Sequence, residues 1–236
     1  EMMQIHRMGV PILMNYALAS VFEIFDEAIV GHYSVEGFAL VGVAASILYT
    51  ITGALGILSS AFHILAAELS GRQEYGKLEQ TFAAAKLLAA GIGGGFVLVS
   101  LLGGRWFFGN IYTVSGRDLE ELLSYFYPAS ITVLQNMIWF QYAAYFRNRY
   151  NTKIGVYATG VSIIVNLFFD VVLVYGKAGF PGMGVAGAAW GSVIGLGSGL
   201  LVYQIPYYRV RCARTGNIQE PIKRILWSYP ALFGQE

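Results

Sequence analysis

The sequence predicts an all-α, polytopic membrane protein. Hydrophobic residues make up 56% of its 236 residues and charged residues only 12%, whereas charged residues are about 25% of a typical soluble domain. The mean hydropathy is +0.56. Because lipid offers the backbone no hydrogen-bond partner, apolar segments of about 20 residues cross a membrane as helices. The alternating pattern of a membrane β-barrel is absent from the sequence.

Six segments are long enough to cross the hydrocarbon core: 8–30, 37–67, 81–103, 122–146, 154–175 and 183–208. We expect residues 1–208 to form one transmembrane lobe of six helices. Residues 209–236 are expected to form a basic cytoplasmic linker and the start of a possible second repeat. The first segment is too long for the apolar part of a cleavable signal peptide and carries three acids, so we expect it to remain as a span.

The basic residues are distributed unevenly over the loops between these segments. Eleven lysines and arginines fall on the side that holds both termini, three fall on the other side, and Lys86 lies within a span. Positive residues favour the cytoplasmic side of a membrane protein. We therefore expect both termini to be cytoplasmic, which requires an even number of spans, and we expect a multi-pass protein of the plasma membrane (the cell inner membrane).

The first span carries three acids, Glu23, Asp26 and Glu27, which share one face of a helix because they are three and four residues apart. An ionised carboxylate inside a bilayer is costly unless it is paired, hydrated or protonated, so such residues usually line a polar pathway. A hydrogen bond that packs two helices together is the alternative.

The third and fourth spans carry polar and aromatic groups. The end of the third is expected to anchor in the headgroup layer, through Trp106, Phe107, Phe108 and Tyr112. The fourth contains Gln135, Asn136, Met137 and Gln141. These four residues either line a cavity or pack the helix against its neighbours.

The fifth span contains a polar ladder, because Ser162, Asn166 and Asp170 are four residues apart. If this ladder faces the acids of the first span, the two stripes form one of two sites. One is a carboxylate pair that accepts protons, and the other is an oxygen-lined hole for a hard cation such as Na⁺.

Glycines mark the sixth span and the loop before it. Gly187, Gly191 and Gly195 recur every four residues, which lets two helix backbones approach closely, and we expect this stripe to pack within the lobe. The loop over residues 175–184 contains four glycines and a proline, which predicts a tight turn.

The residue pattern predicts no catalytic site, no bound cofactor and no metal site beyond a possible Na⁺ site. A single cysteine excludes a thiolate cluster, and the three histidines lack metal-ligand spacing.

Four segments together resemble the multidrug and toxic compound extrusion (MATE) family of transporters. In the first, a proline opens the helix and an aspartate is followed by glycine, as in FDEAIVGH; the second is AELSG after the second span. The other two are the more specific, and they are IVNLFFDVVLVYG over residues 164–176 and GVAGAAWGS over residues 184–192.

The resemblance implies a secondary antiporter that exports small organic compounds, often cationic or amphiphilic, in exchange for H⁺ or Na⁺. It also implies that six helices form one lobe of a two-lobe transporter. Motif by motif, the family's cation site falls on Asp26, Asn166, Asp170 and Ser192, with serine where threonine is more usual. Glu23 and Glu27 depart from the common pattern and could accept protons themselves, so the coupling ion stays open.

A second six-helix lobe is the expected partner, together with the lipid bilayer and small organic substrates; no nucleic acid is expected. The second lobe is either the rest of a longer chain, which we favour because the segment after Arg224 echoes the start of the first span, or a second copy.

Two other functions fit less well. A lipid-linked oligosaccharide flippase of the same superfamily often has a more cationic cavity, whereas the charges within these spans are mainly acidic. An intramembrane prenyl-transfer enzyme needs repeated aspartates to hold Mg²⁺, and Asp170 has no second acid in its segment.

Overall fold

In the computed structural model, the part of the chain that is described is α-helical, with short connecting turns. The structure describes residues 10, 13–14, 17, 20, 24–25, 28–149 and 151–215. Within them five helices follow one another: α2 (Val35–Gly71), α3 (Tyr75–Asn110), α4 (Gly116–Asn148), α5 (Lys153–Tyr175) and α6 (Val185–Thr215). The described residues of the predicted span 8–30 are also helical. The prediction of an all-α fold is confirmed.

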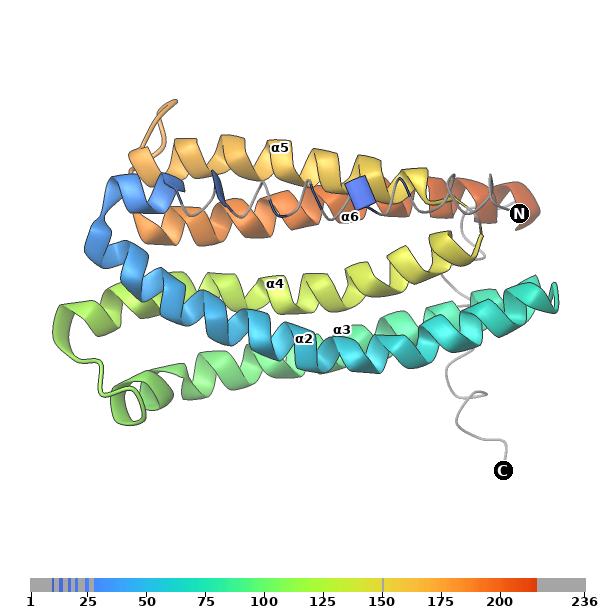
Figure 1. The fold of residues 1–236 in the computed structure, drawn as a ribbon, viewed down its shortest axis with the longest axis horizontal. Coiled ribbons are helices and arrows are strands. Elements are labelled where there is room, and N and C mark those ends of the chain that lie inside the picture. The colour runs from blue at the N-terminus through green and yellow to red at the C-terminus, as the bar shows by residue number, and fades with distance from the viewer. Residues whose placement is uncertain are drawn as a thin grey trace.

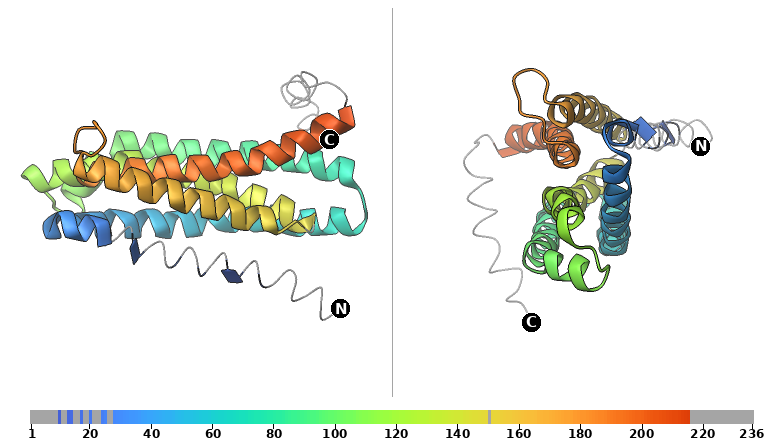
Figure 2. Two further views of the ribbon diagram at one scale, coloured as in Figure 1. Left: turned by 90° about the horizontal axis from the view of Figure 1, so that it is seen from above. Right: turned by 90° about the vertical axis from the view of Figure 1, so that its left-hand side faces the viewer.

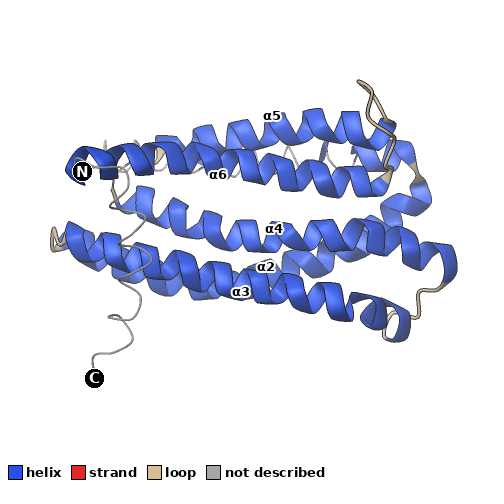
Figure 3. Ribbon diagram, turned by 180° about the vertical axis from the view of Figure 1, so that it is seen from behind, coloured by secondary structure: helices blue, strands red, loops and turns tan. Residues whose placement is uncertain are grey.

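The helices run roughly side by side along the long axis of the molecule (Figure 1). α5 and α6 form one pair, α2 and α3 lie on the opposite side, and α4 runs between them, as the end-on view also shows (Figure 2). The view from behind shows α5 and α6 in contact along most of their length (Figure 3). α4 therefore joins the two sides of the lobe.

This central position explains why α4 is the least apolar helix. Four described helices, α2, α3, α5 and α6, are long and apolar enough to cross a membrane, and α4 is not among them. Its buried side chains outnumber those of α3 and α5, and several are tyrosines. A helix that is surrounded by other helices meets less lipid, so it can carry more polar side chains. α4 also continues through Pro128 without interruption.

Local sequence sets where the helices begin and end. Ser34 caps α2, because its hydroxyl oxygen accepts a hydrogen bond from the Gly37 amide at 2.9 Å. α5 ends at Gly176, whose φ of +68° is left-handed, and a side chain there would meet the backbone nitrogen of Gly182 at 2.6 Å. The predicted tight turn between the fifth and sixth spans is confirmed.

One half of the lobe is packed around aromatic rings. Phe82 of α3 is fully buried and contacts Tyr142 and Tyr145 of α4 and Tyr207 of α6 at centroid distances of 4.4–5.1 Å. The Lys86 ammonium lies 4.5 Å from the centroids of the Phe82 and Tyr207 rings and 5.1 Å from that of Tyr142. Cation–π attraction of this kind accommodates a lysine inside an apolar span.

The aromatic residues at the end of α3 divide into two groups. Trp106 is 63% exposed and Tyr112 is 43% exposed, as expected of headgroup anchors. Phe108 is fully buried, and its ring centroid lies 4.8 Å from that of Phe126. Phe107 is partly buried and packs against the same core. The expectation that all four anchor the helix end is wrong for Phe108, because one side of α3 faces α4.

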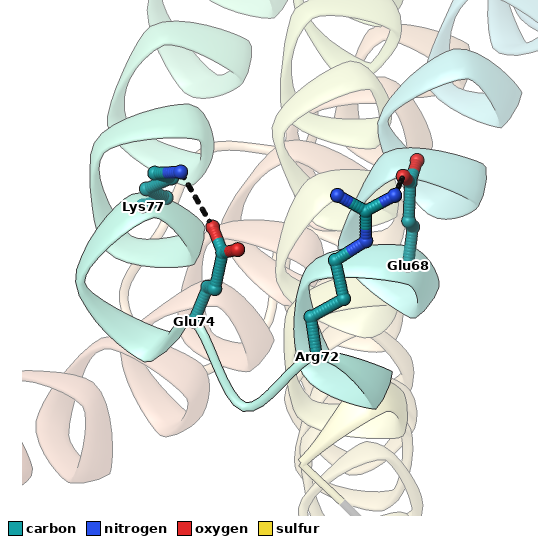
Figure 4. Close-up of polar contacts among 4 residues, drawn as sticks. All are labelled: Glu68, Arg72, Glu74 and Lys77. Carbon is teal, nitrogen blue, oxygen red and sulfur yellow. Dashed lines mark ion pairs between the residues drawn. The ribbon is translucent and has the colours of Figure 1, made fainter.

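The turn between α2 and α3 is lined by two exposed ion pairs (Figure 4). The Arg72 Nη2 lies 2.8 Å from the Glu68 Oε1, and the Lys77 Nζ lies 2.7 Å from the Glu74 Oε2. The hydrogen bond from Lys77 holds the pKa of the Glu74 carboxyl below its ordinary value. Exposed ion pairs add little stability, so we assign the pairs a local role in the turn.

The sharpest test of the packing concerns two neighbouring glycines of α3. A Cβ on Gly93 would lie 2.6 Å from the Leu134 Cα of α4, whereas a Cβ on Gly95 would meet nothing within 4 Å. Alanine stabilises an open helix position by about 1 kcal/mol relative to glycine. We expect Gly93→Ala to lower the thermal unfolding midpoint in detergent and Gly95→Ala to leave it unchanged or raise it. Equal effects of the two substitutions would contradict this packing.

Candidate functional site

The polar ladder of α5 faces α6 in the interior of the lobe. Asp170 has no exposed surface, Asn166 is 2% exposed and Ser162 is 9% exposed. All three lie on one face of α5 because they are four residues apart. The predicted ladder is therefore a buried polar row between two apolar helices.

Hydrogen bonds join three of the predicted site residues. The Asn166 Nδ2 donates to Asp170 Oδ1 at 3.1 Å and lies 3.4 Å from the hydroxyl oxygen of Ser192 on α6. The Asn166 carbonyl oxygen Oδ1 is buried and accepts no hydrogen bond from the described residues. The structure thus brings the Asn166 amide group to a carboxylate and a hydroxyl through its nitrogen. Carboxylate, amide and hydroxyl oxygens are the ligand types that a hard cation prefers.

The glycine stripe of α6 makes this arrangement possible. A Cβ on Gly187 would lie 2.6 Å from the Leu173 carbonyl carbon, and one on Gly195 would lie 2.8 Å from the Ser162 carbonyl oxygen. The two helices therefore approach to backbone contact, and the prediction that the stripe packs within the lobe is confirmed.

The residue pattern alone did not reveal that this stripe faces the polar ladder. Gly191 lies against the Asp170 carboxylate and Gly195 lies against Asn166. Both patterns repeat every four residues, and α5 and α6 are joined by a short turn. Placing the two rows opposite each other in an antiparallel hairpin would have revealed the contact.

The three acids of the first span, Glu23, Asp26 and Glu27, lie outside the described residues, so their roles stay predictions. The chain that follows them is described and packs against the end of α5. The Tyr175 hydroxyl donates to the Ile29 carbonyl oxygen at 3.1 Å, and the Tyr33 ring contacts the Tyr175 ring edge to face at 6.1 Å.

The polar residues of α4 point in different directions. Gln135 donates to the Val193 carbonyl oxygen of α6 at 2.9 Å, one residue beyond Ser192. Gln141 is buried on the other side of the helix and donates to the Ser59 hydroxyl of α2 at 2.6 Å. The bond to Ser59 packs two helices together, which is the alternative that the sequence left open for Gln141. Met137 is buried, and Asn136 is half-buried.

The described residues contain no group of three or more histidine, cysteine or acidic side chains that could hold a metal ion. The chemistry available between α5 and α6 is therefore that of one carboxylate with neutral oxygen groups. Such a site can take up a proton or a weakly held monovalent cation.

Comparison with known sequences gives a consistent result. The sequence model of the MatE family matches residues 11–172. A protein of Thermotoga maritima described as "Probable multidrug resistance protein NorM" is 25% identical over 202 residues, which is 84% of this chain and 43% of that protein. A protein of Halalkalibacterium halodurans with the same description is 42% identical over 43 residues, 18% of this chain and 9% of that protein. The chain spans less than half the length of these relatives.

Solved structures show the same fold at low sequence identity. A transporter of the MOP superfamily from Pyrococcus furiosus, described as having a binding pocket of reverse polarity, superposes with a TM-score of 0.73 at 17% identity, over 90% of this chain and 45% of that one. A MATE protein in the bent conformation gives a TM-score of 0.72 at 16% identity, over 85% and 44% of the two chains.

The hydrogen bond from Asn166 to Asp170 is open to a stability test. Asn166→Leu removes one hydrogen-bond donor to a buried carboxylate, and the loss of a bond of this kind costs about 1–3 kcal/mol. Asn110→Leu is the matched control, because Asn110 makes an exposed bond to the Trp106 carbonyl oxygen at 2.9 Å that water can replace. We expect a lower thermal midpoint for Asn166→Leu and little change for Asn110→Leu. A midpoint for Asn166→Leu equal to that of the control would exclude a stabilising role for the bond.

Proposed function

The chain belongs to the MatE family, and on that premise we propose that it forms one six-helix lobe of a secondary antiporter. The antiporter exports organic cationic or amphiphilic compounds in exchange for H⁺ or Na⁺. The observation that carries this proposal is the complete burial of Asp170 in an apolar helix, hydrogen-bonded to Asn166. An aspartate within a membrane helix is costly, by up to about 2.5–3.5 kcal/mol at the helix centre on insertion scales. The burial of Asp170 between α5 and α6 therefore favours a functional role.

The cation site comprises Asp26, Asn166, Asp170 and Ser192. Contacts of the described residues support the inclusion of Asp26. The Tyr175 hydroxyl bonds to the Ile29 carbonyl, Asp170 precedes Tyr175 by five residues, and Asp26 precedes Ile29 by three. The chain that begins three residues after Asp26 therefore lies beside the end of the helix that carries Asp170.

The neutral oxygens support a role in binding Na⁺ as well as H⁺. A proton needs only the carboxylate, whereas Na⁺ is held by several oxygen atoms. The Asn166 amide nitrogen faces Asp170 and Ser192. Its carbonyl oxygen is therefore available to accept a hydrogen bond from another group or to coordinate a cation. Glu23 and Glu27 serve as further proton acceptors in this proposal.

Transport follows from neutralising the buried charge. When a cation reaches Asp170, the cost of burying the carboxylate falls, and the helices around it pack more closely. The cation can drive this change only by the difference in its affinity for the two conformations. Closing one side of the lobe then displaces the organic substrate from a cavity that Gln135 and Asn136 help to line.

A second six-helix lobe completes the transporter, either as the rest of a longer chain or as a second copy. This part of the proposal is supported by the comparisons, in which the chain matches less than half the length of each relative. We place the protein in the plasma membrane as a multi-pass protein with both termini in the cytoplasm, as the distribution of basic residues favours.

Substitution of the carboxylates tests the proposed function. We expect Asp26→Asn and Asp170→Asn each to abolish ion-driven export of a fluorescent organic cation from cells. The asparagine side chain in each variant lacks the negative charge that binds the coupling ion. Asp118→Asn is the control, since Asp118 is exposed in the first turn of α4. The amount of each variant in the membrane is measured by immunoblotting. Normal export by both mutants at normal abundance would refute the proposal.

The coupling ion is identified with proteoliposomes that contain the native polypeptide and a fluorescent dye. A Na⁺ gradient at constant pH and a pH gradient without Na⁺ are imposed in turn. We expect at least one gradient to drive dye movement in wild type and neither to drive it in Asp170→Asn. Dye movement at equal rates with and without both gradients would contradict ion coupling.

A further inference from the structure

The glycines of α6 differ in what each of them makes room for. A Cβ on Gly187 would meet the backbone of Leu173 and Val174 at 2.6–2.8 Å. A Cβ on Gly199 would overlap the Trp139 ring and lie 2.8 Å from the Ala158 carbonyl oxygen. At these two positions the missing side chain lets helices pack closely and has no contact with the cation site.

Gly191 has a different neighbour. A Cβ at this position would overlap Asp170 Oδ1, and it would lie 2.9 Å from the Asp170 Cγ and 3.1 Å from the Asp170 backbone nitrogen. Of the four glycines in the row 187, 191, 195 and 199, Gly191 is the one whose nearest neighbour is a carboxylate oxygen. The α6 backbone therefore lies directly against one face of the carboxylate.

The same carboxylate oxygen is the acceptor of the Asn166 hydrogen bond. Oδ1 lies 3.1 Å from the Asn166 Nδ2, and this bond orients the Asn166 amide so that its buried carbonyl oxygen accepts no hydrogen bond from the described residues. A group that displaces Oδ1 therefore displaces the acceptor that holds the Asn166 amide, and its carbonyl oxygen, in this orientation. The position of both oxygens thus depends on the space at residue 191.

We propose that Gly191 is a positioning residue of the cation site: its lack of a side chain keeps Asp170 Oδ1 between the α6 backbone and the Asn166 amide. This inference rests on the proposed function. A methyl group at residue 191 would have to displace the carboxylate, because the α5 backbone is too close for the methyl to move away from it. The rotated carboxylate would lose the Asn166 donor, and the Asn166 amide would lose the acceptor that orients it.

The test measures the cation concentration that half-saturates dye export by the native polypeptide in proteoliposomes. Loss of a hydrogen bond to a charged group corresponds to roughly a tenfold or larger change in affinity. We therefore expect Gly191→Ala to shift the half-saturating cation concentration at least tenfold. The shift is upward if the cation is Na⁺, which needs the displaced oxygen atoms, and downward if it is H⁺, because the carboxylate loses a donor that stabilises its charged form. Gly187→Ala is the matched control, since it strains the same helix pair through backbone atoms alone. It is expected to lower the thermal midpoint and to change half-saturation much less than Gly191→Ala does.

The outcomes separate this inference from the proposed function. If Asp170→Asn exports dye normally in response to the ion gradient, the proposed function fails. If Asp170→Asn is inactive while Gly191→Ala and Gly187→Ala have the same half-saturation, the positioning role is overturned and the proposed function stands.

A second pair of variants covers the case in which Gly191→Ala does not fold. Asp170→Ala removes the atoms that the new methyl group would meet first, so the double variant Gly191→Ala, Asp170→Ala is expected to recover folded protein, judged by monodisperse gel filtration. The double variant Gly187→Ala, Asp170→Ala is expected to gain nothing over Gly187→Ala. Recovery in neither double variant, or equal recovery in both, would contradict a specific contact between residues 191 and 170.

Discussion

The close approach of α5 and α6 is the constraint on which the site depends. Four glycines on α6 bring its backbone against α5, and this contact leaves Asp170 with no exposed surface. Burying a carboxylate between apolar helices is unfavourable unless it is hydrogen-bonded or neutralised. The Asn166 amide supplies one hydrogen bond, and a bound cation would supply the neutralising charge. The packing of this helix pair and the ion binding that we propose for it thus depend on the same contact.

The rest of the lobe supports this pair from one side. α4 lies between the α5–α6 pair and α2 and α3 (Figure 1), and it is joined to α6 by the Gln135 bond to Val193 and by stacked aromatic rings. The rings around Phe82 and Lys86 connect α3, α4 and α6. α5 contacts mainly α6, whereas α6 belongs to the aromatic core through Tyr203 and Tyr207, so movement of α6 relative to α3 and α4 would disturb that core.

Much of the fold follows from the sequence because membrane helices obey simple rules. Apolar length predicted the helices, and the spacing of four residues placed Asn166 and Asp170 on one face. The residues that could not be predicted depend on contacts between helices. Phe108 has the same local sequence context as Trp106, and only the presence of α4 beside it determines its burial. Lys86 follows Phe82 by four residues, which suggests one ring contact, but the rings of Tyr142 and Tyr207 come from other helices. The glycine row of α6 and the polar row of α5 were each visible in the sequence. The role of Gly191 could be inferred only once the structure showed that these two rows face each other.

The most direct test of the account is chemical labelling of Asp170 in the native protein with a hydrophobic carbodiimide, which reacts with protonated carboxyl groups within a membrane. Peptide mass spectrometry gives the labelled fraction at several pH values and Na⁺ concentrations. If Asp170 exchanges with the coupling ion, its labelling falls as the pH rises or as Na⁺ is added. Labelling of Asp170 that is independent of both pH and Na⁺ would show that the carboxylate is a structural group, and would contradict its role in cation coupling.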